Sequence, residues 1–238
     1  MLPAPSLFRK EPVARLLGIF VLVVSAVGVL SASASAITNG ELDGNRHPYA
    51  GALVVDGRPA CSSVLVSPTV VVTAAHCVVG AATVSVSFDG TLDPTSPGLL
   101  IGTPHVDTTP GSDLAVIVLD RASTVTPASL PTAQSLERVR SVVAVGYGYY
   151  DLKPEPAFDG FRRFASLEVK NLDGSIVVLQ ERKEGTVCFG DSGGPQLDGD
   201  TVVAITLGGG KHCKGASTGY RLDSPAARGF LSAYVALP

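Results

Sequence analysis

From residue 37 onward, short hydrophobic runs alternate with clusters of turn residues. The runs are rich in Val, Ile, Leu, Tyr and Phe, a composition that favours β-strands. We predict strands at 51–56, 63–67, 70–74, 83–88, 114–119, 141–148, 164–170, 175–179, 201–207 and 218–222. Strands this short and this closely spaced predict an all-β fold, either a sandwich or barrels.

Two stretches depart from this pattern. Residues 123–135 are rich in Pro and Thr and divide the two sets of strands, so we predict a linker there. Near the C-terminus, Ser224 can cap a helix and Pro225 suits its first turn. Apolar residues four apart support this helix: Phe230 with Tyr234, and Leu231 with Val235.

The N-terminal segment has the organisation of a secretory signal peptide. Basic residues at positions 9, 10 and 15 precede a 15-residue apolar run at 16–30, and small residues follow. A membrane anchor is the alternative, but a spanning helix needs about 20 apolar residues and no stop-transfer charge follows Leu30. We predict a signal peptide over residues 1–36, a secreted protein, and no stable membrane association after its removal.

Two positions satisfy the small-x-small rule of signal peptidase. Ala34-Ser35-Ala36 places the cut before Ile37, and Ala32-Ser33-Ala34 places it before Ser35. We favour the first, which begins the mature chain with "ITNG". The second leaves Ser35-Ala36 as a two-residue extension that an aminopeptidase releasing dipeptides would have to remove.

The charge balance excludes one class of function. After residue 36 the chain has 15 Lys and Arg against 20 Asp and Glu, without the clustered basic residues of a nucleic-acid surface. Hydrophobic residues make up 45% of the chain and charged residues 16%, which argues against intrinsic disorder. We therefore expect a folded protein that does not bind nucleic acid.

The predicted export bears on the role of the four cysteines, which are Cys61, Cys77, Cys188 and Cys213. In an oxidising compartment an even count indicates disulfides, and four cysteines allow three pairings. Zinc binding is the alternative, because a His precedes a Cys at 76–77 and again at 212–213. Neighbours on a strand face opposite sides and no CxxC pair is present, so we predict two disulfides.

Three separated motifs carry side chains suited to nucleophilic catalysis: His76 in "TAAHC", Asp113 in "SDLAVIVLD" and Ser192 in "CFGDSGGP". A serine hydroxyl is a weak nucleophile unless a base takes its proton, and a neutral His is such a base near pH 7. A carboxylate fixes the tautomer of the His and stabilises the imidazolium. Glycines beside the serine let the backbone turn so that two N–H groups face a developing oxyanion.

These motifs, with "ITNG", a "GYG" after a strand and the C-terminal helix, resemble the chymotrypsin/trypsin-like serine endopeptidases from Ile37 to the C-terminus. The resemblance implies two six-stranded antiparallel β-barrels with the active site in the cleft between them. The N-terminal barrel would span about residues 37–125 and the C-terminal barrel about 136–238. It also implies protein or peptide substrates, an acyl-enzyme, no cofactor and a monomer.

The same resemblance assigns roles to single residues, and the mechanism is the family's own. His76 is the general base, Asp113 orients it, and Ser192 is the nucleophile. The N–H groups of Gly190 and Ser192 form the oxyanion hole.

Disulfides and an activation pair are also implied. The family's pairing corresponds to Cys61–Cys77 and Cys188–Cys213. In the family, a freed apolar N-terminal residue pairs its α-ammonium with the acid just before the nucleophile, which here means Ile37 with Asp191.

Substrate preference is implied by the specificity pocket. Its floor would be Thr186, six residues before the nucleophile, and its walls would include Val187, Gly208 and Gly219. Binding Arg or Lys would need a buried carboxylate at the floor, and Thr offers none. Glycine walls leave room, so we predict a preference for bulky apolar residues before the scissile bond.

The sequence also departs from the family pattern. The acids of the family's calcium loop are not recognisable after Val84, so we expect no bound metal. Thr206 and Leu207 replace the serine and tryptophan that usually precede the glycine of the pocket strand. A catalytically inactive secreted binding protein on the same fold is the alternative function. Such proteins usually lack the Ser or the His, and both are present here.

Overall fold

The structure is a computed structural model that describes Met1 and residues 37–150, 157–181 and 185–238. The predicted signal peptide therefore lies outside the described residues. The described residues form two sets of β-strands, one short α-helix and two 3-10 helices. None of the helices described has the length and apolar character needed to cross a membrane.

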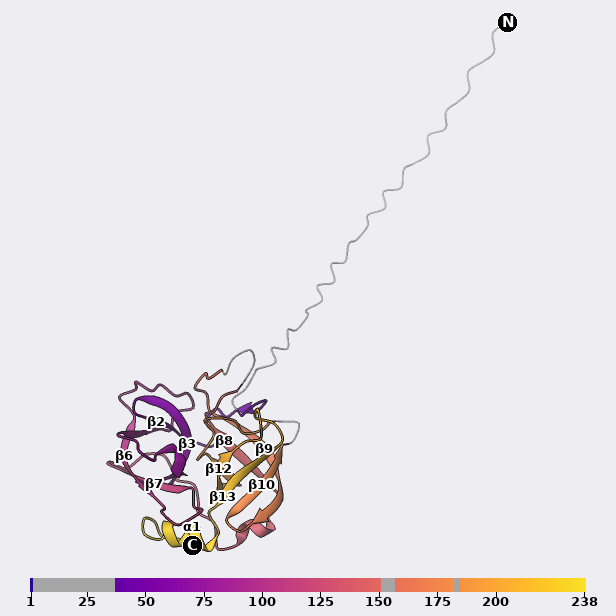
Figure 1. The fold of residues 1–238 in the computed structure, drawn as a ribbon. Helices are drawn as coiled ribbons and strands as arrows, with labels where there is room; N and C mark the ends of the chain where they lie inside the picture. Colours follow the sequence, from indigo (N-terminus) through magenta and orange to yellow (C-terminus); the bar gives the residue numbers. More distant parts are fainter. Residues whose placement is uncertain (2–36, 151–156, 182–184) are drawn as a thin grey trace. The chain divides into compact units, whose positions relative to one another are not determined.

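The first set of strands closes into a six-stranded barrel (Figure 1). Its neighbours pair antiparallel in the order β2-β3-β4-β7-β6-β5. The strands are β2 (Ala50–Val55), β3 (Arg58–Ser67), β4 (Val70–Ala74), β5 (Val84–Ser87), β6 (Leu100–Val106) and β7 (Leu114–Leu119). No hydrophobic run predicted β6, because Gly102 and Pro104 interrupt it. The glycine is required there, since a Cβ at Gly102 would lie 2.5 Å from a methyl group of Ile117.

The second set forms a ring in the order β9-β10-β13-β12-β11-β8, which the β8–β9 pairing closes. Its strands are β8 (Ser141–Gly146), β9 (Arg163–Asp173), β10 (Ile176–Glu181), β11 (Pro195–Asp198), β12 (Thr201–Gly208) and β13 (Ala216–Arg221). The predicted pair of six-stranded antiparallel barrels is thus confirmed. One boundary differs, because β1 (Glu41–Leu42) pairs with β9 and so joins the second barrel instead of the first.

The chain ends in the helix α1 (Pro225–Leu231), which returns to the first barrel (Figure 1). The Ser224 hydroxyl accepts the Ala227 N–H at 3.3 Å and caps the helix as predicted. Ala227 and Leu231 are buried in the same hydrophobic cluster as the strands of the first barrel. The α-helix ends four residues before Val235, and turns follow it.

Candidate active site

His76 and Asp113 come from neighbouring strands of the first barrel. The 3-10 helix η1 (Ala75–Cys77) directly follows β4, so His76 stands just past the end of that strand. Asp113 directly precedes β7, which pairs antiparallel with β4. The Ala75 N–H donates to the Asp113 carbonyl at 3.2 Å and continues the pairing beyond the strands. Residues 37 positions apart in the sequence are thereby brought side by side.

The Asp113 carboxylate holds His76 through two hydrogen bonds. One oxygen lies 2.7 Å from the ring Nδ1, and the other accepts the backbone N–H of His76 at 2.9 Å. The ring bond to Asp113 raises the pKa of His76 above its ordinary 6.5, although burial opposes the shift. Burial acts to raise the pKa of Asp113, but the hydrogen bonds from His76 outweigh it and lower that pKa. An ionised Asp113 fixes the proton on Nδ1 and leaves Nε2 free to accept one.

Ser192 lies on the second barrel, in the loop that precedes β11. Its hydroxyl donates to the Leu207 carbonyl at 3.1 Å, and within the described chain it makes no hydrogen bond to His76. The Ser192 carbonyl accepts the Ser62 N–H at 2.9 Å, which ties the loop to the first barrel. His76 and Ser192 line the same pocket. Because the hydroxyl of Ser192 donates its hydrogen to Leu207, it must rotate away from that carbonyl before His76 can accept the proton.

Glycines on both sides of Ser192 allow the tight loop. Gly190 and Gly193 have φ of +90° and +78°, the left-handed region that favours glycine. A Cβ at Gly193 would lie 2.1 Å from the Thr73 hydroxyl, so a larger residue does not fit. The N–H groups of Gly190 and Ser192 donate to no described residue. Both are available to an oxyanion.

Ser62 is a site residue that sequence reasoning missed. Its hydroxyl donates to the Gly190 carbonyl at 2.9 Å and accepts the Tyr147 N–H at the same distance of 2.9 Å. These bonds fix the peptide between Gly190 and Asp191, and with it the direction of the nearby N–H groups. Ser62 lies inside β3 with no motif around it, so no sequence signal marks this role.

Asp191 directly precedes the nucleophile Ser192, and its side chain is fully buried. No described cation bonds to it. Its two oxygens accept the N–H groups of Cys188 and Gly148, each at 2.8 Å. Burial raises the pKa of Asp191 to about 7, against the effect of these bonds and of the Arg163 charge. Ile37 is also fully buried, but its nitrogen belongs to a peptide bond in the unprocessed chain and makes no bond to Asp191.

The buried acid predicts an unusual pH dependence for the unprocessed chain. A pKa raised from 3.8 to about 7 means that the folded state binds a proton more tightly than the unfolded state. The stability that this bound proton contributes is therefore lost as the pH rises from 3.8 to about 7. Relative to an Asp191→Asn variant, the chain beginning at Ser35 should lose up to about 4 kcal/mol in free energy of unfolding from pH 4 to pH 8. Denaturant titrations of both chains measure this, and a difference that does not change with pH would contradict it.

A pocket of about 260 Å³ lies beside Ser192. It is lined by His76, Cys188, Phe189, Ser192, Leu207, Gly208, Gly209, Gly210 and Cys213. Of the four predicted specificity residues, only Gly208 borders it.

The other three predicted pocket residues, Thr186, Val187 and Gly219, are not among the residues that line this pocket. Thr186 and Val187 are buried, because the neighbouring loop rests against them: a Cβ at Gly209 would lie 2.3 Å from the Val187 carbonyl. Gly219 faces Gln196, whose side-chain oxygen would lie 2.2 Å from a Cβ there. It pairs with Thr206 across β12 and β13, and spacing along the sequence does not reveal this register.

The four cysteines form the disulfides Cys61–Cys77 and Cys188–Cys213. The first braces His76, and the second joins the nucleophile loop to the loop that lines the pocket. Cys61, His76 and Cys77 are the described residues whose potential metal-ligating atoms gather within 4.8 Å. Since both sulfurs are in the disulfide, they are not thiolates that could hold zinc.

Comparison with known proteins now places this geometry in a family. A family model described as Trypsin matches residues 37–225. The chain belongs to the trypsin family. A relative named trypsin, from Saccharopolyspora erythraea, is 27% identical over 185 residues, which represent 68% of this chain and 82% of the relative.

Solved structures show the same fold as this trypsin-family chain. HL collagenase has a TM-score of 0.69 and 17% identity, covering 84% of this chain and 100% of that one. Human heparin binding protein has a TM-score of 0.69 and 18% identity, and the match covers 84% of this chain and 99% of that one. Mouse neuropsin, a serine protease, has a TM-score of 0.65 and 20% identity, and the match covers 77% of this chain and 93% of that one.

Within the trypsin family, Thr206 is one of this chain's departures. Its hydroxyl accepts a bond from the Gln196 amide at 3.3 Å and bonds no other described residue. The backbone of Thr206 still holds the nucleophile loop, because it accepts the Gly193 N–H at 2.7 Å and donates to Gly194 at 2.9 Å. The backbone of β12 therefore stays attached to the nucleophile loop with Thr206 at this position.

Proposed function

We propose that the mature protein is a secreted serine endopeptidase. The observation that carries the proposal is the 2.7 Å bond between Asp113 and the ring of His76, which lines one pocket together with Ser192. Nε2 of His76 takes the hydroxyl proton as Oγ of Ser192 attacks the substrate carbonyl. The N–H groups of Gly190 and Ser192 stabilise the oxyanion. His76 then gives its proton to the leaving amine, and water hydrolyses the acyl-enzyme through the same base.

Secretion is part of this proposal. The apolar run at 16–30 supports export, and the two disulfides support an oxidising environment. The substrates would be proteins or peptides, and the enzyme would act as a monomer without a cofactor.

The preference for bulky apolar residues before the scissile bond is supported by the pocket at Ser192. Its described lining contains Phe189, Leu207 and glycines and has no carboxylate to pair with a substrate cation. A peptide library varied at the residue before the scissile bond tests the preference. We expect Phe, Tyr or Leu to be favoured, and a strong preference for Arg would contradict the assignment.

A second candidate is binding without catalysis. Two observations favour it: Ser192 bonds Leu207 and not His76, and human heparin binding protein shares the fold. A fluorophosphonate separates the candidates because it phosphonylates only an activated serine. We expect the folded mature protein to take up one label per chain at Ser192. No uptake by a protein shown to be folded would favour binding over catalysis.

The His76–Asp113 bond sets the expected pH profile. Because the base must be neutral, kcat/KM should rise with pH through a pKa above 6.5. An Asp113→Asn variant loses the bond that raises this pKa, so the acid limb should move to lower pH while kcat falls about 10⁴-fold. Ester hydrolysis measured from pH 5 to pH 9 tests both effects. An unchanged limb in the variant would show that Asp113 does not cause the shift.

A further inference from the structure

Residues 147–149 directly follow β8 and form a supporting segment for the nucleophile loop. The Gly148 N–H donates to the Asp191 carboxylate at 2.8 Å. The Tyr149 N–H donates to the Phe189 carbonyl at 2.7 Å. The approach is close, because a Cβ at Gly148 would lie 2.6 Å from the Phe189 carbonyl. The position of the nucleophile loop therefore depends on the position of the supporting segment.

The third N–H of the supporting segment acts through Ser62. The Tyr147 N–H donates to the Ser62 hydroxyl at 2.9 Å, and that hydroxyl donates to the Gly190 carbonyl at 2.9 Å. A hydroxyl has one hydrogen to donate, and the bond accepted from Tyr147 leaves this hydrogen for Gly190. The Ser62 N–H also donates to the Ser192 carbonyl at 2.9 Å. Ser62 thus holds two carbonyls of the nucleophile loop.

The same contacts set the direction of an oxyanion donor. In a trans peptide the C=O and the N–H point in opposite directions. The Phe189 carbonyl accepts the Tyr149 N–H, so the N–H of the same peptide, which belongs to Gly190, points away from the supporting segment. This N–H is one of the two proposed oxyanion donors, and a shift of the supporting segment would turn it.

The side chain of Tyr147 anchors the supporting segment to the first barrel. Tyr147 is 2% exposed, and its hydroxyl donates to the Asp89 carbonyl at 2.6 Å. The hydroxyl also accepts a hydrogen bond from Nη1 of Arg162 at 3.1 Å. Burial raises the pKa of Tyr147 to about 12, so the hydroxyl keeps its hydrogen at neutral pH.

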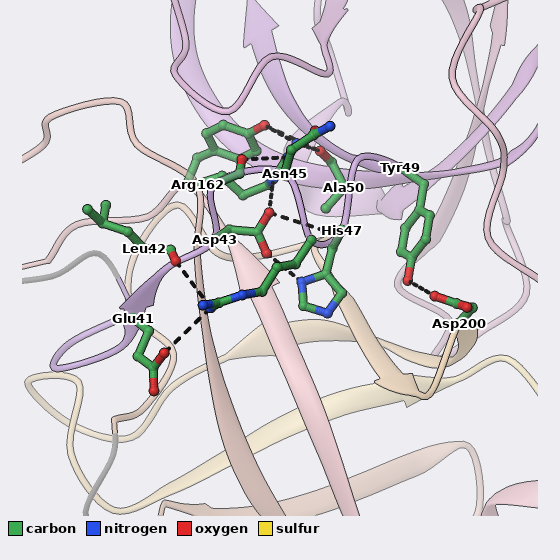
Figure 2. Close-up of polar contacts among 12 residues, drawn as sticks. Glu41, Leu42, Asp43, Asn45, His47, Tyr49, Ala50, Arg162 and Asp200 are labelled. Atoms are coloured by element: carbon green, nitrogen blue, oxygen red, sulfur yellow. Dashed lines mark hydrogen bonds and ion pairs between the residues drawn. The ribbon is translucent and has the colours of Figure 1, made fainter.

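A buried guanidinium holds the Tyr147 hydroxyl in turn (Figure 2). Arg162 is 1% exposed, and its Nε donates to the Asp43 carboxylate at 2.8 Å. The other oxygen of this carboxylate contacts Nδ1 of His47. Nη1 of Arg162 also donates to the Ala50 carbonyl of the first barrel at 3.0 Å. Since the guanidinium is a rigid fork, these partners fix the position of the N–H that meets Tyr147.

We propose that Tyr147 is a positioning residue for the oxyanion hole. The buried Asp43–Arg162 pair holds its hydroxyl, and the ring holds the supporting segment. This segment, together with Ser62, directs the Gly190 N–H toward the developing oxyanion. The proposal rests on the endopeptidase function proposed above. Tyr147 would act on kcat through these contacts and without touching the scissile bond.

Tyr147→Phe tests the proposal on the mature protein, because it removes the hydroxyl and keeps the ring. Removing an oxyanion donor outright costs about 10²- to 10³-fold in kcat, and a donor that is only turned should cost less. For one peptide amide substrate we expect kcat to fall about 5-fold in Tyr147→Phe and about 10-fold in Ser62→Ala, with KM unchanged. Titration to completion with a fluorophosphonate gives the amount of active enzyme in each preparation.

Two nearby side chains supply matched controls. Tyr49→Phe also loses a tyrosine hydroxyl that reaches the second barrel, where it donates to Asp200 at 2.9 Å (Figure 2). Ser63→Ala also loses a buried hydroxyl of β3, which donates to the Gly51 carbonyl at 3.2 Å. Neither bond involves the nucleophile loop or the supporting segment, so both variants should keep the wild-type kcat.

A transition-state analogue distinguishes positioning from general damage to the fold. When a peptide aldehyde binds, Oγ of Ser192 adds to the aldehyde carbon, His76 takes the hydroxyl proton, and the aldehyde oxygen becomes an oxyanion. The Ki of this inhibitor should rise in Tyr147→Phe by the factor by which kcat/KM falls. The matching peptide alcohol forms no oxyanion and should bind wild type and variant equally well.

The double variant Ser62→Ala/Tyr147→Phe shows whether the two residues act through the same contacts. Independent losses would multiply to about 50-fold, and we expect about 10- to 15-fold instead. If Tyr147→Phe does not fold, Arg162→Lys replaces it. Lysine keeps a cation for Asp43 but loses the fork that reaches the Tyr147 hydroxyl, so kcat should fall in the same way.

A wild-type kcat in Tyr147→Phe, a loss confined to KM, or losses that multiply in the double variant would each overturn this proposal and leave the endopeptidase function standing. An equal loss in Tyr49→Phe would also overturn it. If the wild-type mature protein hydrolyses no peptide and takes up no fluorophosphonate, the endopeptidase function is wrong, and this proposal with it.

Discussion

Replacing Ser192 with alanine is expected to lower kcat for peptide hydrolysis by about 10⁴- to 10⁶-fold. The variant keeps Asp113, His76 and both oxyanion N–H groups but has no atom that can form the acyl-enzyme. The activity that remains reflects substrate binding and the oxyanion hole alone. Rates with an apolar peptide substrate measure the loss, and the variant should take up no fluorophosphonate.

The three residues should act as one unit, which a double variant can show. His76→Ala is expected to cost about as much as Ser192→Ala, and the double variant little more than either alone. His105→Ala is the control, because His105 lies in β6 and contacts Tyr234 of the C-terminal segment instead of the site. Losses that add in the double variant would mean that the residues do not share a single step.

The motif residues could be predicted because each has a local signature. His76, Asp113 and Ser192 stand in short motifs, and the alternation of strands and turns indicates barrels. The strand β11, by contrast, has the sequence "PQLD", which is too short and polar to be recognised. Gly219 shows a related limit: it pairs with Thr206 across β12 and β13 and lies against Gln196, and this register cannot be read from the spacing along the sequence.

Residues that support the site from a distance had no signature at all. Asp43 and Arg162 pair although 119 positions separate them, and each by itself reads as an ordinary surface charge. Ser62 bonds Gly190 across 128 positions. Only the closed barrels bring such residues together, so their roles depend on tertiary structure and not on local pattern.

Full activity is expected only from a chain that begins at Ile37. Asp191 is fully buried, and no described cation bonds to it while the Ile37 nitrogen is part of a peptide bond. We propose that cleavage after Ala36 turns that nitrogen into an α-ammonium that pairs with Asp191. Ile37 also has φ of +43°, a costly conformation for a β-branched residue that cleavage would release. The pair would fix Asp191 and hold the Gly190 N–H toward the oxyanion.

Loss of this pair should have a large effect. An unpaired buried charge costs about 3–5 kcal/mol, so a chain beginning at Ser35 should be at least about 100-fold less active in kcat/KM. N-terminal sequencing of the secreted protein, together with its activity, shows which form is made. The comparison uses three chains: one that begins at Ile37, one that begins at Ser35, and an Ile37→Val variant that begins at residue 37. The valine variant should preserve activity because it keeps the α-ammonium.

The Ser35 form also separates a missing ammonium from a misfolded protein. An aminopeptidase that releases dipeptides would remove Ser35-Ala36 and should restore activity to the level of the chain beginning at Ile37. If the Ser35 form is fully active without this treatment, the ammonium is not needed and Asp191 must be stabilised by its two backbone N–H bonds alone. If it is inactive and then recovers, the two residues act as a plug, and exposure of the Ile37 N-terminus is the activating step.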